Sequence, residues 1–219
     1  MPHSSDDVSK LKFHVFRDER FVDLNLYQFG WEHTTPAHSY GPHARNHYLF
    51  HYIIAGKGVL LANEQEYPIT AGHGFLVVPG QITTYRSDES DPWEYTWLEF
   101  DGLRAHESLN LAGISGKEPV YTARSKRDGQ LLQDEMLYIV NHSEASPTHL
   151  IAHGYLFLDQ LVQSSANRQE GREGVCGISI SRKPWSLSTG IISGIFPLRR
   201  SPPSAGSTAA TSARYFGIL

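Results

Sequence analysis

The feature that most constrains this sequence is a series of short apolar segments separated by turn residues between positions 48 and 100. Residues 48–55 (YLFHYIIA) and 75–78 (FLVV) are rich in the aromatic and β-branched side chains that favour strands. Glycine-containing turns at 56–58 and 71–74 and the Pro79-Gly80 pair interrupt the series. Such close alternation of strand and turn predicts a mainly β fold, either a sandwich or a small barrel.

One strand of this series is expected to carry a row of aromatic side chains. Residues 93–100 (WEYTWLEF) alternate, so that Trp93, Tyr95 and Trp97 share one face of a strand. With Tyr85 on a neighbouring strand they would line a barrel interior suited to a small polar ligand, and Arg45 or Glu32 could anchor it by charge. The alternative is that these aromatic side chains only fill the interior.

The pattern becomes helical after the strands. Residues 128–141 and 148–164 place apolar side chains at helical spacing, and Ser146-Pro147 fits an N-cap followed by proline at the first helical position. The second helix has an apolar stripe that includes Ile151, Leu158, Leu161 and Val162. These side chains must pack either on the barrel or against a second copy in a dimer.

The composition changes abruptly near position 174. The first 173 residues contain all 23 acidic residues, all 12 histidines and 14 of the 19 basic residues, whereas residues 174–219 contain five basic residues and no acid. Prolines at four positions of that second segment oppose a long helix. We therefore expect a folded body up to about residue 165, followed by a linker and an unstructured tail over 166–219.

Several classes of protein are excluded or disfavoured by composition. One cysteine in 219 residues leaves no internal disulfide and no multi-thiolate zinc site. The formal net charge of −4 gives no strong attraction to nucleic acid or anionic membranes. Residues 1–10 are polar, and no apolar run reaches membrane-spanning length. The expectation is a cytoplasmic protein without membrane contact.

Ordered motifs within residues 30–163 resemble the N-terminal sensing domain of AraC-family transcription regulators. The resemblance rests on RNHYLFHYIIAGKG (45–58), AGHGFLVVPG (71–80), Tyr85 and DPWEYTWLEF (91–100), with PAHSYGPH (36–43) upstream. It implies a cupin-like antiparallel β-barrel, of the jelly-roll or double-stranded β-helix type, followed by a two-helix dimerisation segment. The implied layout is an N-terminal arm at 1–20, an effector-binding barrel at 21–101 and helices at 102–165.

The resemblance also implies a function and a ligand site. The effector would be small and sugar-like, held by Tyr85, Tyr95 and Trp97, with Arg45 as a further ligand contact, beside the charged anchor that Glu32 could supply. Tyr95 stands where the arabinose-responsive members carry histidine. The chain would form a homodimer through Ile151, Leu158, Leu161 and Val162, and it would need no cofactor. Effector binding would reorder the N-terminal arm and change how a dimer presents its DNA-binding halves.

The tail does not match the helix-turn-helix domain that follows the sensing domain in this family. We therefore expect no direct DNA binding from this chain alone. One hypothesis for the tail is a frameshift after about Glu173, which would leave residues 174–219 out of frame. The sequence of the gene tests that hypothesis, because an early stop without a helix-turn-helix in the shifted frame would contradict it.

Two other functions stay open at this point. A metal-dependent cupin enzyme could use His47, His51 and a carboxylate such as Glu99, although the sequence lacks the H-x-H pair of such sites. A stand-alone sugar-binding protein would have the same barrel without a regulatory partner. Metal analysis separates the first alternative from an effector sensor, and no catalytic residue is predicted.

Overall fold

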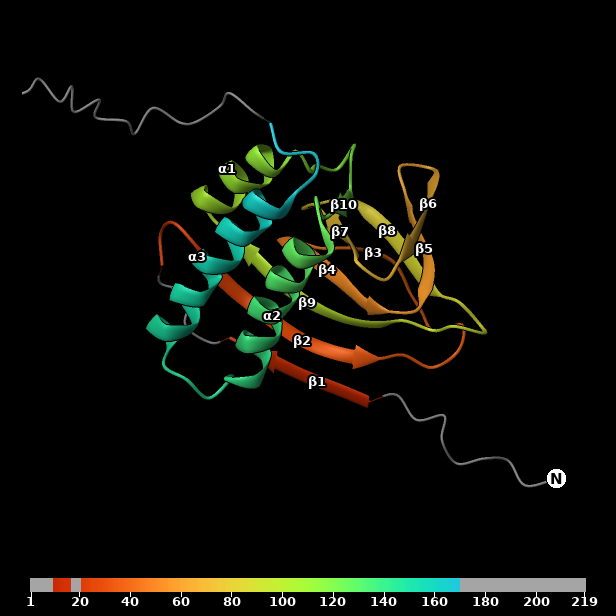
Figure 1. The fold of residues 1–219 in the computed structure, drawn as a ribbon, viewed down its shortest axis with the longest axis horizontal. Coiled ribbons are helices and arrows are strands. Elements are labelled where there is room, and N and C mark those ends of the chain that lie inside the picture. The colour runs from red at the N-terminus through yellow and green to blue at the C-terminus, as the bar shows by residue number, and fades with distance from the viewer. Residues whose placement is uncertain (1–9, 17–20, 170–219) are drawn as a thin grey trace, which may run out of the picture. The chain divides into compact units, whose positions relative to one another are not determined.

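The computed structural model of this chain describes residues 10–16 and 21–169 (Figure 1). The tail from 174 to 219 lies outside the described residues, so its expected lack of structure and its frameshift origin both stay predictions. The described part of the chain begins with a strand, continues through a β-rich body and ends with helices.

Ten strands in the described residues form two antiparallel sheets. The larger sheet has the order β1-β2-β9-β4-β7-β10, and the smaller has the order β3-β8-β5-β6. The strands are β1 (Lys10–Val15), β2 (Asn25–His33), β3 (Ser39–Ala44), β4 (Tyr48–Ala55), β5 (Lys57–Ala62), β6 (Gln65–Thr70), β7 (His73–Val77), β8 (Ile82–Ser87), β9 (Glu94–Asp101) and β10 (Val120–Thr122). This is the expected mainly β, cupin-like fold.

Each central strand of the larger sheet serves two different cores, because successive side chains point to opposite faces. On β9, Tyr95 and Trp97 belong to the core between the two sheets, whereas Leu98 and Phe100 belong to the core beneath the helices. Trp93, just before this strand, joins Tyr95 and Trp97 in the inter-sheet core. The predicted aromatic face is therefore correct.

Three helices cover the outer face of the larger sheet (Figure 1). They are α1 (Leu103–Ala112), α2 (Lys126–Asn141) and α3 (Pro147–Ser164). Ser125 caps α2, and Ser146 caps α3 with Pro147 in its first turn, as the sequence predicts. Among the helices of the described residues, none is long and apolar enough to span a bilayer.

The structure corrects three details of the predicted layout. The segment from 102 to 165 holds three helices and strand β10, so the two-helix prediction misses α1, which buries only Ala105, Leu109 and Ala112. Part of the predicted arm is strand β1, which pairs with β2 along its length. Residues 39–44, for which the sequence predicts no strand, form β3, which pairs with β8 across an irregularity in register.

Candidate functional site

The candidate site begins with three rows of residues that cross the larger sheet. Strand β9 lies between β2 and β4, and its register places Glu32 beside Tyr95 and His51 beside Trp97. A third row, one step further along, joins Gln28 to Glu99. Since these positions are two residues apart on each strand, their side chains share the face that looks toward the smaller sheet.

Aromatic rings and one carboxylate form the middle of this interior. Tyr95 Oη donates a 2.6 Å hydrogen bond to Oε2 of Glu32, which is buried with it. The Trp97 ring lies over Gly30, where a Cβ would come within 2.5 Å of the indole, and it stacks on Phe13 of β1 with centroids 6.3 Å apart. Glycine at position 30 therefore makes room for the indole.

His51 lies at the centre of the aromatic cluster. Its ring centroid is 4.4 Å from that of Phe75, 4.9 Å from Tyr85 and 5.1 Å from Tyr95. The side chain is 2% exposed, and Nδ1 is a buried side-chain atom without a hydrogen-bond partner in the described residues. Burial, followed by the charge of Arg45, lowers the pKa of His51 well below its usual 6.5, so the ring is neutral at neutral pH.

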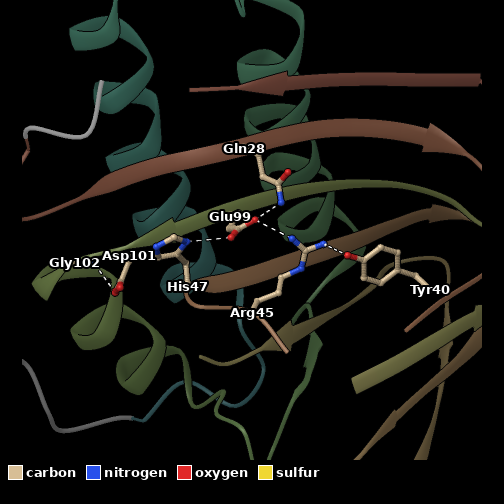
Figure 2. Close-up of polar contacts among 7 residues, drawn as sticks. All are labelled: Gln28, Tyr40, Arg45, His47, Glu99, Asp101 and Gly102. Atoms are coloured by element: carbon tan, nitrogen blue, oxygen red, sulfur yellow. Dashed lines mark hydrogen bonds and ion pairs between the residues drawn. The ribbon is translucent and has the colours of Figure 1, made fainter. Parts of the chain in front are cut away.

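Glu99 is a buried carboxylate with three partners at one end of this interior (Figure 2). Oε2 accepts a 3.0 Å hydrogen bond from Arg45 Nη1 and a second bond from Gln28 Nε2, and Oε1 lies 3.1 Å from His47 Nδ1. The His47 ring in turn stacks on Tyr27 with centroids 3.5 Å apart. These contacts compensate the cost of removing the carboxylate from water.

Arg45 connects the Glu99 cluster to the aromatic residues. Its Nη2 donates a 3.1 Å hydrogen bond to Tyr40 Oη (Figure 2), and Tyr40 stacks on Tyr85 with centroids 5.3 Å apart. Burial raises the pKa of Tyr85, and burial with the neighbouring Tyr85 and Glu32 raises that of Tyr95. Both phenols are therefore protonated, and each can donate or accept a hydrogen bond.

The predicted ligand residues come together in this interior. Tyr85, Tyr95, Trp97 and Glu32 surround His51 or contact its neighbours, and Arg45 joins them through Tyr40. Sequence reasoning considered His51 and Glu99 only as metal ligands and did not identify Gln28 or Tyr40. Period-two alternation places residues 47 and 51 on one face of their strand and residues 95, 97 and 99 on one face of theirs. The pairing of β4 with β9, which brings these two faces together, was not readable from the sequence.

The structure does not favour the metal site considered from the sequence. His47 and Glu99 are in contact, but His51 is packed among aromatic rings. Within residues 10–16 and 21–169, no group of three or more His, Cys, Asp or Glu side chains could hold a metal ion. The three residues proposed as ligands therefore do not converge on one position.

The predicted dimerisation residues are buried within this chain. Ile151, Leu158, Leu161 and Val162 of α3 are at most 9% exposed and belong to the core between the helices and the larger sheet. The same helix exposes Tyr155 at 40% and Leu156 at 48%. The four predicted residues thus pack on their own sheet, which is the other alternative that the sequence left open.

Comparison with known proteins places these features in context. The family described as the AraC-like ligand binding domain matches residues 25–158. The Msm operon regulatory protein of Streptococcus mutans is 29% identical over 126 residues, which cover 58% of this chain and 44% of that protein. The raffinose operon transcriptional regulatory protein RafR of Pediococcus pentosaceus is 35% identical over 124 residues, covering 55% and 44% respectively.

A solved structure of the AraC-like transcriptional activator CuxR also matches. It is 17% identical, with a TM-score of 0.45, over 68% of this chain and 55% of that chain. The aligned region spans less than half the length of the two curated relatives above.

Proposed function

This chain belongs to the family of AraC-like ligand binding domains, and from that premise we propose that it senses a small, sugar-like effector in the interior between its two sheets. The observation that carries the proposal is the unpartnered Nδ1 of His51 at the centre of the aromatic cluster. A buried polar atom without a partner costs free energy, which a ligand hydroxyl would recover by hydrogen bonding to it.

The chemistry of the surrounding side chains supports a polyhydroxylated ligand. Trp97 and Tyr85 offer ring faces on which the apolar face of a sugar can stack. Glu32 and Glu99 are acceptors for ligand hydroxyls, and Arg45 is a donor. The name of the relative RafR, a regulator of a raffinose operon, fits a saccharide effector.

The sharpest test is a matched pair of tyrosine variants. Tyr95 and Tyr121 each donate a 2.6 Å hydrogen bond in a buried site, but Tyr95 lies in the interior and Tyr121 donates to Ser164 on the helix side. A panel of mono- and oligosaccharides is first screened for an increase in melting temperature, since a ligand that binds only the folded state stabilises it. Tyr95→Phe should weaken the response to the active sugar, and Tyr121→Phe should not.

Three results would contradict this proposal. The first is a panel in which no saccharide changes the melting temperature or gives heat in titration calorimetry. The second is an active sugar whose affinity falls equally in both variants, because that would indicate a general loss of stability. The third is retained affinity in Tyr95→Phe, which would place the sugar elsewhere on the molecule.

We further propose that the chain takes part in regulating transcription, as its relatives do. In that role it would form a homodimer through the C-terminal helices. Since the four predicted contacts are buried, the exposed Tyr155 and Leu156 of α3 would make that contact. Sedimentation of Leu156→Glu should show a weaker dimer than the wild-type chain. Leu103→Glu, at an exposed position of α1, is the control. A wild-type chain that sediments as a monomer at high concentration would contradict the dimer.

A further inference from the structure

A second pocket lies on the opposite face of the larger sheet, where α2 begins. It has a volume of about 470 Å³ and is bounded by β4, the turn between β6 and β7, the end of β10 and the first half of α2. That volume is within the range of small-molecule sites. Its polar lining includes Tyr52, His73, Ser125, Lys126, Gln130 and Gln133.

Tyr52 is the residue that points to a ligand here. The side chain is 3% exposed, yet its hydroxyl has no hydrogen-bond partner among the described residues, although it lines the pocket. Burial, with a contribution from the charge of Asp134, raises the pKa of Tyr52, so the hydroxyl keeps its proton. Because this hydroxyl reaches the pocket and makes no hydrogen bond to the described residues, its proton can be donated to a group bound there.

Gly129 keeps this hydroxyl accessible. It lies inside α2, where glycine costs about 1 kcal/mol relative to alanine. A Cβ at this position would come 2.6 Å from Tyr52 Oη and 3.1 Å from the Ala123 Cβ. The helix can therefore pass over the Tyr52 hydroxyl only because residue 129 has no side chain.

The charge around the pocket favours an anion. None of its lining residues is acidic, while Lys126 contributes a cation and His73 an imidazole. The pocket lies at the N-terminus of a 16-residue helix, which carries partial positive charge. Asp128, in the first turn, is not among the lining residues and lies 3.7 Å from Arg124 Nε.

We propose that this pocket binds a small phosphorylated metabolite of about monosaccharide size. Tyr52 Oη donates to the phosphate, and Lys126 and the start of α2 supply positive charge. Gln130 and Gln133 contact the hydroxyls of the ligand. The site is separate from the interior that holds the effector, although Tyr52 and His51 are consecutive residues of β4 and face opposite sides of the sheet.

The test uses the full chain labelled with ¹⁵N and titrated with glucose 6-phosphate, glycerol 3-phosphate, inorganic phosphate and glucose. We expect saturable shifts of the Gly129 and Gly72 amide signals with at least one phosphorylated probe. Unphosphorylated glucose should leave these two signals unchanged. The proposal is wrong if none of the three phosphorylated probes shifts them, or if glucose shifts them equally.

Variants assign the binding to individual groups. Tyr52→Phe keeps the ring and should weaken the responding probe about tenfold, as expected for a lost hydrogen bond to a charged group. Lys126→Gln should weaken it several-fold and reduce its salt dependence. The matched controls are Tyr48→Phe, at the start of β4, and the exposed Lys117→Gln. Unchanged affinity in Tyr52→Phe, or equal loss in its control, would overturn the assignment.

Discussion

The two faces of the larger sheet are built from the same strands but have different chemistry. The face beneath the helices is mostly aliphatic and phenylalanine-rich, and two of its buried polar groups are paired: Thr96 Oγ1 donates to the Gly30 carbonyl at 2.8 Å, and Tyr121 donates to Ser164. The face toward the smaller sheet buries two carboxylates, a neutral histidine and four tyrosine or tryptophan rings.

This difference separates the part of the core that stabilises the fold from the part that can bind the effector. Apolar burial beneath the helices contributes stability without a specific partner. Buried polar groups between the sheets oppose folding unless they are paired. Among the described residues, His51 Nδ1 is the buried side-chain atom that has no hydrogen-bond partner, and leaving it unpaired does not stabilise the fold. We therefore expect substitutions on the helix side to change stability, and substitutions between the sheets to change effector affinity.

The largest expected effect is a loss of stability on the helix side. Phe157 of α3 is 1% exposed and packs against Phe50 and Phe100, with centroids 5.8 Å and 5.4 Å away. Phe157→Ala should lower the free energy of unfolding by about 3–5 kcal/mol, from lost burial and the cavity left behind. Urea denaturation measures this, with Leu131→Ala at an exposed position of α2 as control. If Phe157→Ala lost less free energy of unfolding than the control, the helix side would not be the stabilising face of the larger sheet.

A smaller loss is expected when the Glu99 carboxylate is removed from the opposite face. Glu99→Ala leaves Arg45, His47 and Gln28 without their acceptor and should cost about 2 kcal/mol, since hydrogen bonds to charged groups are each worth roughly 1.5–3. Effector affinity should fall as well, because Arg45 loses its orientation. Glu107→Ala breaks an exposed ion pair with Arg104 and should leave both quantities unchanged. Equal behaviour of the two variants would contradict the role of Glu99.

His51 should make stability depend on pH. Its pKa in the folded protein lies well below the usual 6.5, so below that pH the unfolded chain binds a proton that the folded chain does not. Stability is therefore lost as pH falls, with a slope that approaches about 1.4 kcal/mol per pH unit until the pH reaches the folded-state pKa.

The variant His51→Phe isolates this contribution. Relative to wild type, it should lose less stability between pH 6.5 and 5 in urea denaturation, and it should no longer respond to the effector. His33→Gln, at an exposed end of β2, should keep the wild-type pH slope. If His51→Phe keeps that slope too, His51 titrates in both states and is not the desolvated group that the structure indicates.

The comparison also shows why much of the fold could be predicted from the sequence. Alternation along 93–100 placed the aromatic residues on one face, and helical spacing with Ser146-Pro147 predicted α3. Element α1 was missed because it buries few residues, and β10 because it has three residues. β3 has the Gly41-Pro42 pair of a loop and is mostly exposed, so its pairing with β8 comes from tertiary context.

The candidate site was predictable only in part. The resemblance to a known family supplied Tyr85, Tyr95 and Trp97, which the structure brings together around His51. The Glu99 cluster depends on the registers of β2 with β9 and of β4 with β9. Those registers join residues that are 39 or more positions apart in the sequence, and no local pattern specifies them. The prediction therefore found the aromatic residues with Arg45 and Glu32, and missed the network in which Glu99 joins Gln28, Arg45 and His47.

The smallest expected effect tests whether the two faces are independent. Ser146 Oγ accepts a hydrogen bond from the His149 amide at the start of α3, far along the chain from the strands of the interior. Ser146→Ala should lower the free energy of unfolding by about 1 kcal/mol, because it removes the N-cap, and Ser146→Asp should restore the loss. Neither variant should change effector affinity by calorimetry. A change in affinity that Asp reverses would mean that α3 and the interior are coupled, and the division between a stabilising face and an effector-binding face would have to be abandoned.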